Sequence, residues 1–344
     1  MSEPSGPLSE ELRSMRLVDY RDSDALQHTP TRYGFGDGLV EAGRRDPHVV
    51  AVCADLTEST RMQAFSKEFP DRFIEIGVQE QLLAAMSAGL AMAGKVPFIA
   101  SYAMFCPGRA WEQVRTNICL NDANVKIAGA HAGVSVGPDG ATHQAIEDIA
   151  ILRPIPNITI VVPCDAPQTK KATLAVAATP GPAYVRFGRD ASPVLTTDET
   201  PFELRKAQVF REGHDVAIIA CGILVYNALM AAERLAREDH LECLVLNNHT
   251  IKPMDERAVV EAARTCGAVV TVEEHEVLGG MGSRVAEILA THHPVPMEFL
   301  GVHNRFGQSG TPEELIEEYG MGIGSIYAAI KRVVSRKHEG RQRP

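Results

Sequence analysis

The chain has 344 residues, of which 45% are hydrophobic and 23% charged, and its net charge is −10. This length predicts two domains with ordinary hydrophobic cores. The negative charge argues against a nucleic-acid partner, and no stretch approaches the roughly 18 unbroken apolar residues of a membrane span. The polar N-terminus does not resemble a signal peptide. The seven scattered cysteines predict reduced, buried thiols and a cytoplasmic protein.

Short apolar runs alternate with helical patterns through the first half of the chain. Continuous apolar strands separated by helices are typical of a doubly wound parallel sheet, buried on both faces. We therefore predict an α/β domain over residues 28–190, after an N-terminal arm (1–27) with a short helix at Leu8–Met15. The expected strands are Val49–Ala54, Phe73–Ile76, Val96–Ala100, Val125–Ala130, Ile158–Val162 and Ala183–Phe187, with helices such as Gln81–Ala93 and Arg109–Leu120 between them.

Residues 191–206 interrupt this pattern. They are rich in Thr, Pro and acidic residues and contain no convincing element, so we interpret them as a linker. A second, smaller α/β domain with a mostly parallel sheet is predicted over residues 207–334, and the basic residues 335–344 are predicted to form a flexible tail. The elements expected in the second domain are Val216–Cys221, Tyr226–Arg237, Cys243–Leu246, Ala268–Glu273 and Met297–Gly301.

A candidate functional carboxylate lies just after the strand that ends at Gly77, where Glu80 opens a nearly all-apolar helix. A glutamate in a first helical turn is often only a favourable charge at the positive end of the helix dipole. The following turns have no polar face, however, so we predict that this helix is buried. A carboxylate in such a place must find a partner or be neutralised.

A Gly- and Asp-rich loop runs from His131, at the end of a strand, to His143, at the start of a helix. In open α/β sheets, ligands bind at loops that follow the carboxyl ends of strands. Turn and helix-cap preferences account for Asp139, Gly140 and Thr142. They give no reason for a histidine at each end of the same loop, so His131 and His143 are candidate site residues.

Three motifs occur in the order found in transketolases: the G-x-x-E-Q helix start at Glu80, the G-x-D-G-x-T-H-Q loop, and the segment Phe306–Gly310. Over residues 28–333 the chain resembles the pyrimidine-binding and C-terminal domains of that family. The resemblance implies a thiamine diphosphate-dependent transferase with two α/β domains. Such an enzyme moves a two-carbon ketol unit from a ketose phosphate to an aldose or aldose phosphate.

The resemblance also implies roles for residues near the cofactor. Glu80 matches the glutamate that hydrogen-bonds the aminopyrimidine ring and favours its reactive tautomer. Tyr102 and Phe105 match aromatic residues that stack on that ring, although core packing would explain Tyr102 equally well. Some relatives carry a third aromatic residue at the position of Gly108. Asp55 matches a residue near the thiazolium ring.

On the sugar side, Asp139 and His143 match residues that contact substrate hydroxyls and phosphate, and His131 matches one near the donor carbonyl. Both histidines would also assist proton transfers. The family's phosphate-binding residues match Arg32, Ser59 and Arg189. Cationic and polar groups from separate loops would suit a sugar phosphate dianion, whereas many exposed arginines form only weak surface ion pairs.

Transketolases also have an N-terminal domain in which a G-D-G motif and a downstream asparagine hold the diphosphate through a metal ion. Here Gly36–Gly38 has these letters but lies in a helical pattern, and no asparagine follows until Asn117. We therefore expect thiamine diphosphate to bind between this chain and a separate N-terminal transketolase subunit in an α2β2 assembly. That partner would hold Mg²⁺ or Ca²⁺, and no metal ligand is predicted in this chain.

Two alternatives stay open. The chain could be the β subunit of a 2-oxoacid dehydrogenase-like enzyme, or a specialised transketolase that delivers its two-carbon unit to a lipoyl or carrier-protein thiol. It could also be a silent regulatory or scaffolding subunit, although Glu80, Asp139 and the two histidines argue against that. In the second domain, Glu273–His275 and Gly279–Gly282 could suggest a metal or phosphate loop, but we expect a structural role.

Overall fold

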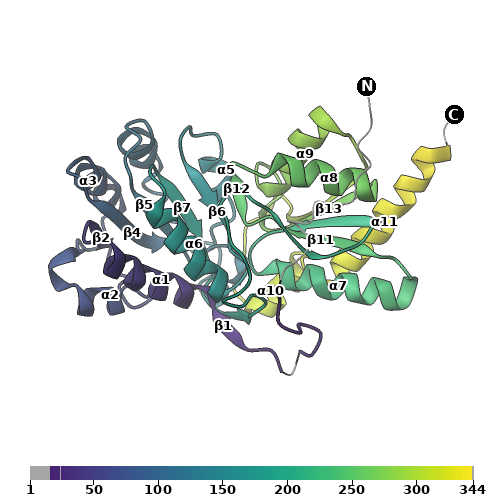
Figure 1. The fold of residues 1–344 in the computed structure, drawn as a ribbon, viewed down its shortest axis with the longest axis horizontal. Helices are drawn as coiled ribbons and strands as arrows, with labels where there is room; N and C mark the ends of the chain where they lie inside the picture. The colour runs from purple at the N-terminus through teal and green to yellow at the C-terminus, as the bar shows by residue number, and fades with distance from the viewer. Residues whose placement is uncertain (1–15, 24, 343–344) are drawn as a thin grey trace.

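Figure 1 shows a computed structural model of the chain, which describes residues 16–23 and 25–342. The helix expected at Leu8–Met15 lies outside the described residues. Two lobes, each a sheet with helices packed on it, lie side by side and confirm the predicted pair of α/β domains. All seven cysteines are buried and unpaired. None of the helices described is long and apolar enough to cross a membrane.

The first lobe is built on a seven-stranded sheet. Its strands are β2 (Val49–Cys53), β3 (Phe73–Glu75), β4 (Val96–Tyr102), β5 (Lys126–Ala130), β6 (Thr159–Val161), β7 (Ala183–Arg186) and β12 (Thr250–Lys252). They follow the order β12-β6-β7-β5-β4-β2-β3, and only β12 is antiparallel to its neighbour. The six strands predicted here are all present. Strand β3 is only partly buried, contrary to expectation, because it lies at the edge of the sheet.

Helices cover both faces of this sheet, as a doubly wound fold requires. One hydrophobic cluster joins one face to α1 (Thr31–Arg45), α2 (Gln63–Glu68) and α6 (Ala166–Ala178). Another joins the opposite face to α3 (Glu80–Met92), the π-helical turn η3 (Val114–Cys119) and α5 (Asp148–Leu152), and continues into the second lobe. Helices α1 and α6 approach so closely that a Cβ at Gly38 would lie 2.8 Å from the Thr173 Cβ, so this position requires glycine. Gly36–Gly38 lies within α1, as the helical pattern of the sequence predicted.

Two helical predictions need correction. The helix expected at Arg109–Leu120 begins later, as the short α4 (Trp111–Gln113), and continues as η3. Helix α3 was expected to be buried on all sides, but Leu82 is 44% exposed and Met92 73% exposed. Only the face with Glu80, Leu83, Ala84, Ser87 and Ala88 is buried in this chain. The helix is apolar all round because its residues are hydrophobic, but this chain covers only one of its faces.

The second lobe holds a five-stranded sheet of β9 (Gln208–Arg211), β10 (Val216–Ala220), β11 (Cys243–Asn247), β13 (Val269–Glu276) and β14 (Met297–Val302). The order is β14-β13-β10-β11-β9, and only β9 is antiparallel. Its helices are α7 (Leu224–Asp239), α8 (Glu256–Cys266), α9 (Met281–His292), α10 (Pro312–Glu318) and α11 (Ile323–Gln342). Helix α11 extends into the segment expected to be a flexible tail, where Lys337 donates to the carbonyl oxygens of Asp215 and Cys266.

The segment expected to be an unstructured linker contains a strand. Strand β8 (Ala191–Pro193) pairs antiparallel with β1 (His28–Pro30) and anchors the start of the first domain. The lobes are joined further along by β12, a strand from the second half of the chain that completes the first sheet. The two domains are thus connected by backbone hydrogen bonds as well as by a shared core.

Candidate active site

Glu80 begins α3 and is only 2% exposed. Its Oε2 accepts a hydrogen bond of 2.8 Å from Arg109 Nη1, and its Oε1 accepts one of 3.3 Å from Ser101 Oγ. The carboxylate has therefore found a partner, as its burial required. That partner was not anticipated from the sequence. The available signal was a lone arginine shortly after Phe105, within reach of a buried acid that needed a cation.

Four rings gather at the carboxyl ends of β4 and β5. Tyr102 and His131 stack with centroids 4.1 Å apart, and Phe105 meets His143 edge-on at 5.3 Å. Tyr102 and Phe105 lie 6.2 Å apart with nearly parallel planes. The guanidinium carbon of Arg109 lies 4.8 Å from the Phe105 centroid, which connects this aromatic cluster to Glu80. The structure thus brings together five predicted site residues from three separate segments.

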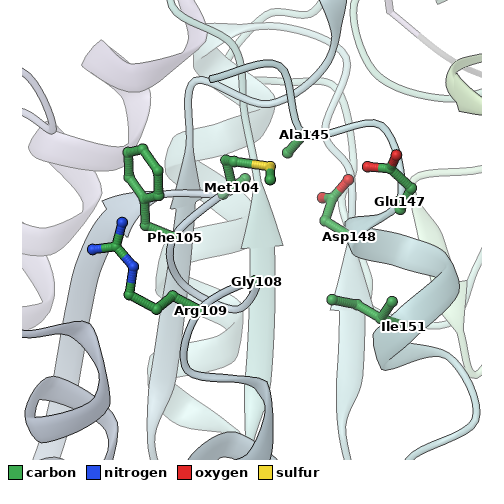
Figure 2. A pocket seen from close by; sticks show the side chains of 9 residues that line it. Met104, Phe105, Gly108, Arg109, Ala145, Glu147, Asp148 and Ile151 are labelled. Atoms are coloured by element: carbon green, nitrogen blue, oxygen red, sulfur yellow. The ribbon is translucent and has the colours of Figure 1, made fainter. Parts of the chain in front are cut away.

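A cavity of about 420 Å³ lies beside Phe105 and Arg109, and Figure 2 shows Glu147 and Asp148 across it. Its volume is within the range of small-molecule sites. Position 108 must be glycine, because a Cβ there would lie 1.9 Å from the Met104 carbonyl oxygen. An aromatic side chain therefore cannot occupy position 108, and the Arg109 guanidinium packs on the Phe105 ring.

His131 is 1% exposed and has a left-handed backbone conformation, with φ of 56°. Burial lowers its pKa to about 3, with further contributions from the positive charges of Arg32 and Arg189. The imidazole is therefore neutral near pH 7. Its buried Nδ1 has no hydrogen-bond partner. A neutral ring with an unused nitrogen can accept or donate a hydrogen bond to a ligand, depending on its tautomer.

The predicted anion-binding residues come from three segments: Arg32 from the start of α1, Ser59 from the turn after β2, and Arg189 from the loop after β7. Arg32, in the first turn of α1, donates from Nη1 to the Ser59 carbonyl oxygen at 3.0 Å, while its buried Nε has no partner. Arg189 follows β7 and pairs with Asp139 at 3.0 Å. Because both arginines depress the pKa of His131, their charges reach the same part of the site. The Arg189–Asp139 pair is about one-third exposed, so a ligand can reach both partners.

Asp55 lies in the loop that follows β2. It is exposed, has φ of 62°, and its side chain makes no hydrogen bond or ion pair with the residues described. The Asp55 backbone N–H donates to Glu75 Oε1 at 2.7 Å, and the Gly77 N–H donates to the same oxygen at 3.0 Å. Glu75 thereby connects the loop after β2 to the turn before Glu80. Sequence reasoning missed Glu75 because it treated this residue as one more strand position.

The third motif supports the loop that carries Asp139 and His143. Gln144 Nε2 donates to the Gln308 carbonyl oxygen at 2.9 Å, and Tyr319 donates to the Phe306 carbonyl oxygen at 2.8 Å. Residues 306–310 of the second domain are thus packed against the loop of the first. Their observed contribution is to position that loop.

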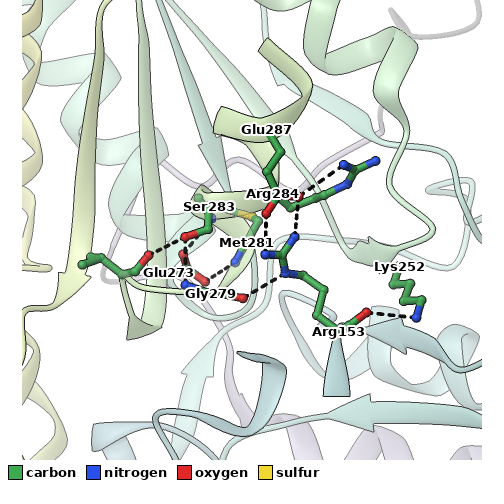
Figure 3. Close-up of polar contacts among 10 residues, drawn as sticks. Arg153, Lys252, Glu273, Gly279, Met281, Ser283, Arg284 and Glu287 are labelled. Carbon is green, nitrogen blue, oxygen red and sulfur yellow. Dashed lines mark hydrogen bonds and ion pairs between the residues drawn. The ribbon is translucent and has the colours of Figure 1, made fainter. Parts of the chain in front are cut away.

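The acidic segment of the second domain has structural contacts. Figure 3 shows Glu273 at the start of α9, where its carboxylate accepts from the Met281 and Gly282 N–H groups at 2.6 and 2.7 Å. Burial raises the pKa of Glu273 to about 7. Glu274 accepts from the Ser135 N–H, and His275 Nε2 from the Ala150 N–H. Among the side chains described, no group of three or more His, Cys, Asp and Glu could hold a metal ion.

The fold is that of a two-domain α/β protein, and its candidate site residues gather at the carboxyl edge of the first sheet. The transketolase pyrimidine binding domain matches residues 27–194, and the transketolase C-terminal domain matches residues 205–326. The chain belongs to the transketolase family.

The relatives include transketolase subunits and a split-gene transketolase. The chain is 39% identical to the 6-deoxy-6-sulfo-D-fructose transketolase subunit SqwH of a Clostridium species, over 88% of this chain and 94% of that protein. It is 41% identical to a subunit of the apulose-4-phosphate transketolase of Phocaeicola vulgatus, over 84% and 93%. A solved structure described as "Split gene transketolase, inactive beta4 tetramer" matches with a TM-score of 0.84 and 42% identity, over 90% of this chain and 99% of that one.

Proposed function

We propose that this chain is the C-terminal subunit of a two-component, thiamine diphosphate-dependent transketolase that transfers a ketol unit from a ketose phosphate to an aldose or aldose phosphate. The observation that carries the proposal is the Glu80 carboxylate, 2% exposed and connected through Arg109 to the aromatic cluster. These residues fit an aminopyrimidine ring. A carboxylate can accept from a ring nitrogen, and flat side chains such as Phe105 can stack on the ring.

When bound, thiamine diphosphate supplies an electron sink for the two-carbon unit. Glu80 would hold a proton at the pyrimidine N1′, while Tyr102 and Phe105 would orient the ring. Asp55 would face the thiazolium side of the site. Because burial keeps His131 neutral, its role would be a hydrogen bond near the donor carbonyl rather than protonation by a charged imidazolium.

For the sugar, the proposal assigns terminal-anion binding to three residues and hydroxyl recognition to two. Arg32 suits the first task because its buried Nε is unused by the protein. The two relatives named above are described by sugars that carry a sulfo or phosphate group. Both observations favour an anionic sugar over an uncharged lipoyl arm. The anion-binding residues are Arg32, Ser59 and Arg189, and the hydroxyl-binding residues are Asp139 and His143.

Exposed apolar side chains along α3 and η3 support a separate partner. Val78 is 63% exposed, Met92 73% and Leu120 74%, all in or beside α3 and η3. Large exposed apolar surfaces mark interaction sites. We place the N-terminal transketolase subunit on this face, holding the diphosphate through Mg²⁺ or Ca²⁺, in an α2β2 assembly. The unpaired thiols fit a reducing cytoplasmic compartment.

The test is ketol transfer by this chain combined with an N-terminal subunit, comparing Glu80→Gln with wild type. We expect the substitution to lower kcat by at least about 10²-fold, the scale of lost acid–base assistance. Circular dichroism and assembly with the partner should be unchanged. Glu203→Gln, at an exposed position in the linker, is the matched control.

Acceptor assays separate the alternatives. Activity with aldose phosphates and none with lipoamide supports the proposal, and the reverse result would replace it with the dehydrogenase-like alternative. Normal turnover by Glu80→Gln would remove the assignment of this residue. An assembled pair with bound cofactor but no transfer to any acceptor would instead support a silent subunit.

A further inference from the structure

One guanidinium contacts both a buried acid and an aromatic ring that the proposed function assigns to the same cofactor ring. Arg109 Nη1 lies 2.8 Å from Glu80 Oε2, and its guanidinium carbon lies 4.8 Å from the centroid of Phe105. We infer that Arg109 is a positioning residue that keeps the Glu80 carboxylate ionised and in place for the cofactor's pyrimidine. This inference rests on the proposed function and deepens it.

The two partners differ greatly in exposure. The Glu80 side chain is 2% exposed and that of Arg109 51% exposed. A buried carboxylate loses its hydration, and only a close cation with good hydrogen-bond geometry compensates for that loss. Arginine suits this place better than lysine, because its edge can bond a carboxylate while its face lies on an aromatic ring. The half-exposed end of the pair leaves the guanidinium open to the adjoining cavity, where it is a lining residue.

No other described group near Glu80 supplies a compensating charge. Its remaining partner, Ser101, is a neutral hydroxyl at 3.3 Å. Cys106 stays a neutral thiol, because burial raises its pKa to about 12. Across the cavity, Asp148 is paired with Arg186 at 2.8 Å, and Glu147 is a second acid rather than a cation. Without Arg109, desolvation would therefore favour the protonated form of Glu80.

The charge of this carboxylate matters for the chemistry proposed. An anion accepts a hydrogen bond from a pyrimidine that carries a proton at N1′, whereas a protonated acid would itself donate to an unprotonated ring nitrogen. Loss of Arg109 should consequently lower activity most at low pH, and part of the activity should return as the pH rises. A residue that only stabilised the loop would lower activity by the same factor at every pH.

The first experiment uses the isolated chain and needs neither cofactor nor partner. ¹³C NMR of labelled glutamate side chains follows the carboxyl titrations, and the Glu80 signal is identified by its loss in Glu80→Gln. In Arg109→Gln, Glu80 should take up its proton at a pH at least about one unit higher than in wild type, since an opposite charge within contact distance has been removed. Arg109→Lys should lie between the two. An unchanged titration in Arg109→Gln would overturn the inference.

The second experiment uses the assembled enzyme. The acid limb of the kcat/KM profile should move to higher pH in Arg109→Gln by about one unit, which is about a tenfold loss on that limb, and Arg109→Lys should restore part of it. Arg264→Gln is the control, because Arg264 is exposed on α8 of the second domain and its side chain makes no hydrogen bond or ion pair with the residues described. A uniform loss across all pH values would reduce Arg109 to a structural role.

The two experiments also separate this inference from the proposed function. If Arg109→Gln shifts the Glu80 titration but the wild-type assembly transfers no ketol unit, the proposed function is wrong and the control of the Glu80 charge by Arg109 still holds. Efficient ketol transfer by wild type, together with an unshifted titration, would overturn the role of Arg109 alone.

Discussion

Two buried histidines near the carboxyl ends of parallel strands, one in each domain, differ in the hydrogen bonds of their rings. His131 is 1% exposed and His275 0% exposed. Burial lowers the pKa of the first to about 3 and of the second to about 4. Both ring nitrogens of His275 are used, Nδ1 by the Glu276 carbonyl oxygen and Nε2 by the Ala150 N–H. The ring of His131 makes no hydrogen bond to any residue described, and its Nδ1 is buried.

The same contrast separates two buried glutamates. Glu273 accepts from two backbone N–H groups at the start of a helix, so its partners are fixed by the fold. Glu80 depends on the side chain of Arg109, which is half exposed. Buried polar groups are almost always satisfied, and one that the fold leaves unsatisfied calls for an explanation. We therefore interpret the backbone contacts of Glu273 as structural and the unused Nδ1 of His131 as a candidate ligand contact.

The largest expected effect follows from the unused nitrogen of His131. His131→Asn should lower kcat/KM of the assembled enzyme by about 10²-fold, the scale typical of a lost hydrogen-bonding or proton-transfer residue. The free energy of unfolding should fall less than in His275→Asn, because the His131 ring loses its stacking on Tyr102 but no protein hydrogen bond. Steady-state ketol transfer and urea denaturation measure the two quantities. His275→Asn is the counterpart and should show the opposite pattern, and equal activity losses in both variants would break the comparison.

Glu273→Ala should act on stability instead. Its carboxylate satisfies the N–H groups of Met281 and Gly282, and leaving a buried donor without an acceptor costs about 1–3 kcal/mol. We expect the free energy of unfolding to fall by about 2–3 kcal/mol in urea denaturation. The kcat of the molecules that remain folded should equal that of wild type. A selective loss of activity with unchanged stability would show that this segment has a functional role.

Sequence patterns were sufficient for most of the strands in the two sheets. Strands such as β2 and β5 are buried along their whole length, so a continuous apolar run identifies them. Strands β8 and β12 have only three residues each and include polar side chains. Their pairing with β1 and β6 depends on segments far away in the chain, and no local pattern encodes it.

The candidate residues could be named from sequence, but their partners could not. Glu80 was recognisable because a charge precedes an apolar helix. Its ion pair with Arg109 depends on how the chain turns at Gly108, which follows from contacts with the Met104 backbone. The exposed face of α3 was missed for a related reason. Hydrophobicity shows that a surface avoids water, but it does not show whether the same chain or another one covers it.

A substitution of Arg189 tests whether this residue binds the anionic group of the substrate, and its expected effect on kinetics is smaller. Arg189→Ala should raise KM for a phosphorylated acceptor about tenfold, equivalent to about 1.4 kcal/mol, with kcat changed little. An unphosphorylated aldose serves as the control, because its KM should be the same in both enzymes. Loss of the Arg189–Asp139 ion pair alone would raise both KM values together, since that pair is present without any ligand.

The smallest effect is one that the two histidines should share. A pKa lowered from the ordinary value of 6.5 means that the unfolded chain takes up the proton first. The associated stability is fully present above about pH 6.5 and is lost as the pH falls toward the folded value, by about 1 kcal/mol per histidine between pH 7 and pH 5.5. His131→Asn and His275→Asn should each reduce this loss by that amount in urea denaturation at the two pH values. A reduction confined to His275→Asn would mean that His131 already binds protons in the folded chain, and its buried ring nitrogen would then no longer distinguish a ligand site from a structural one.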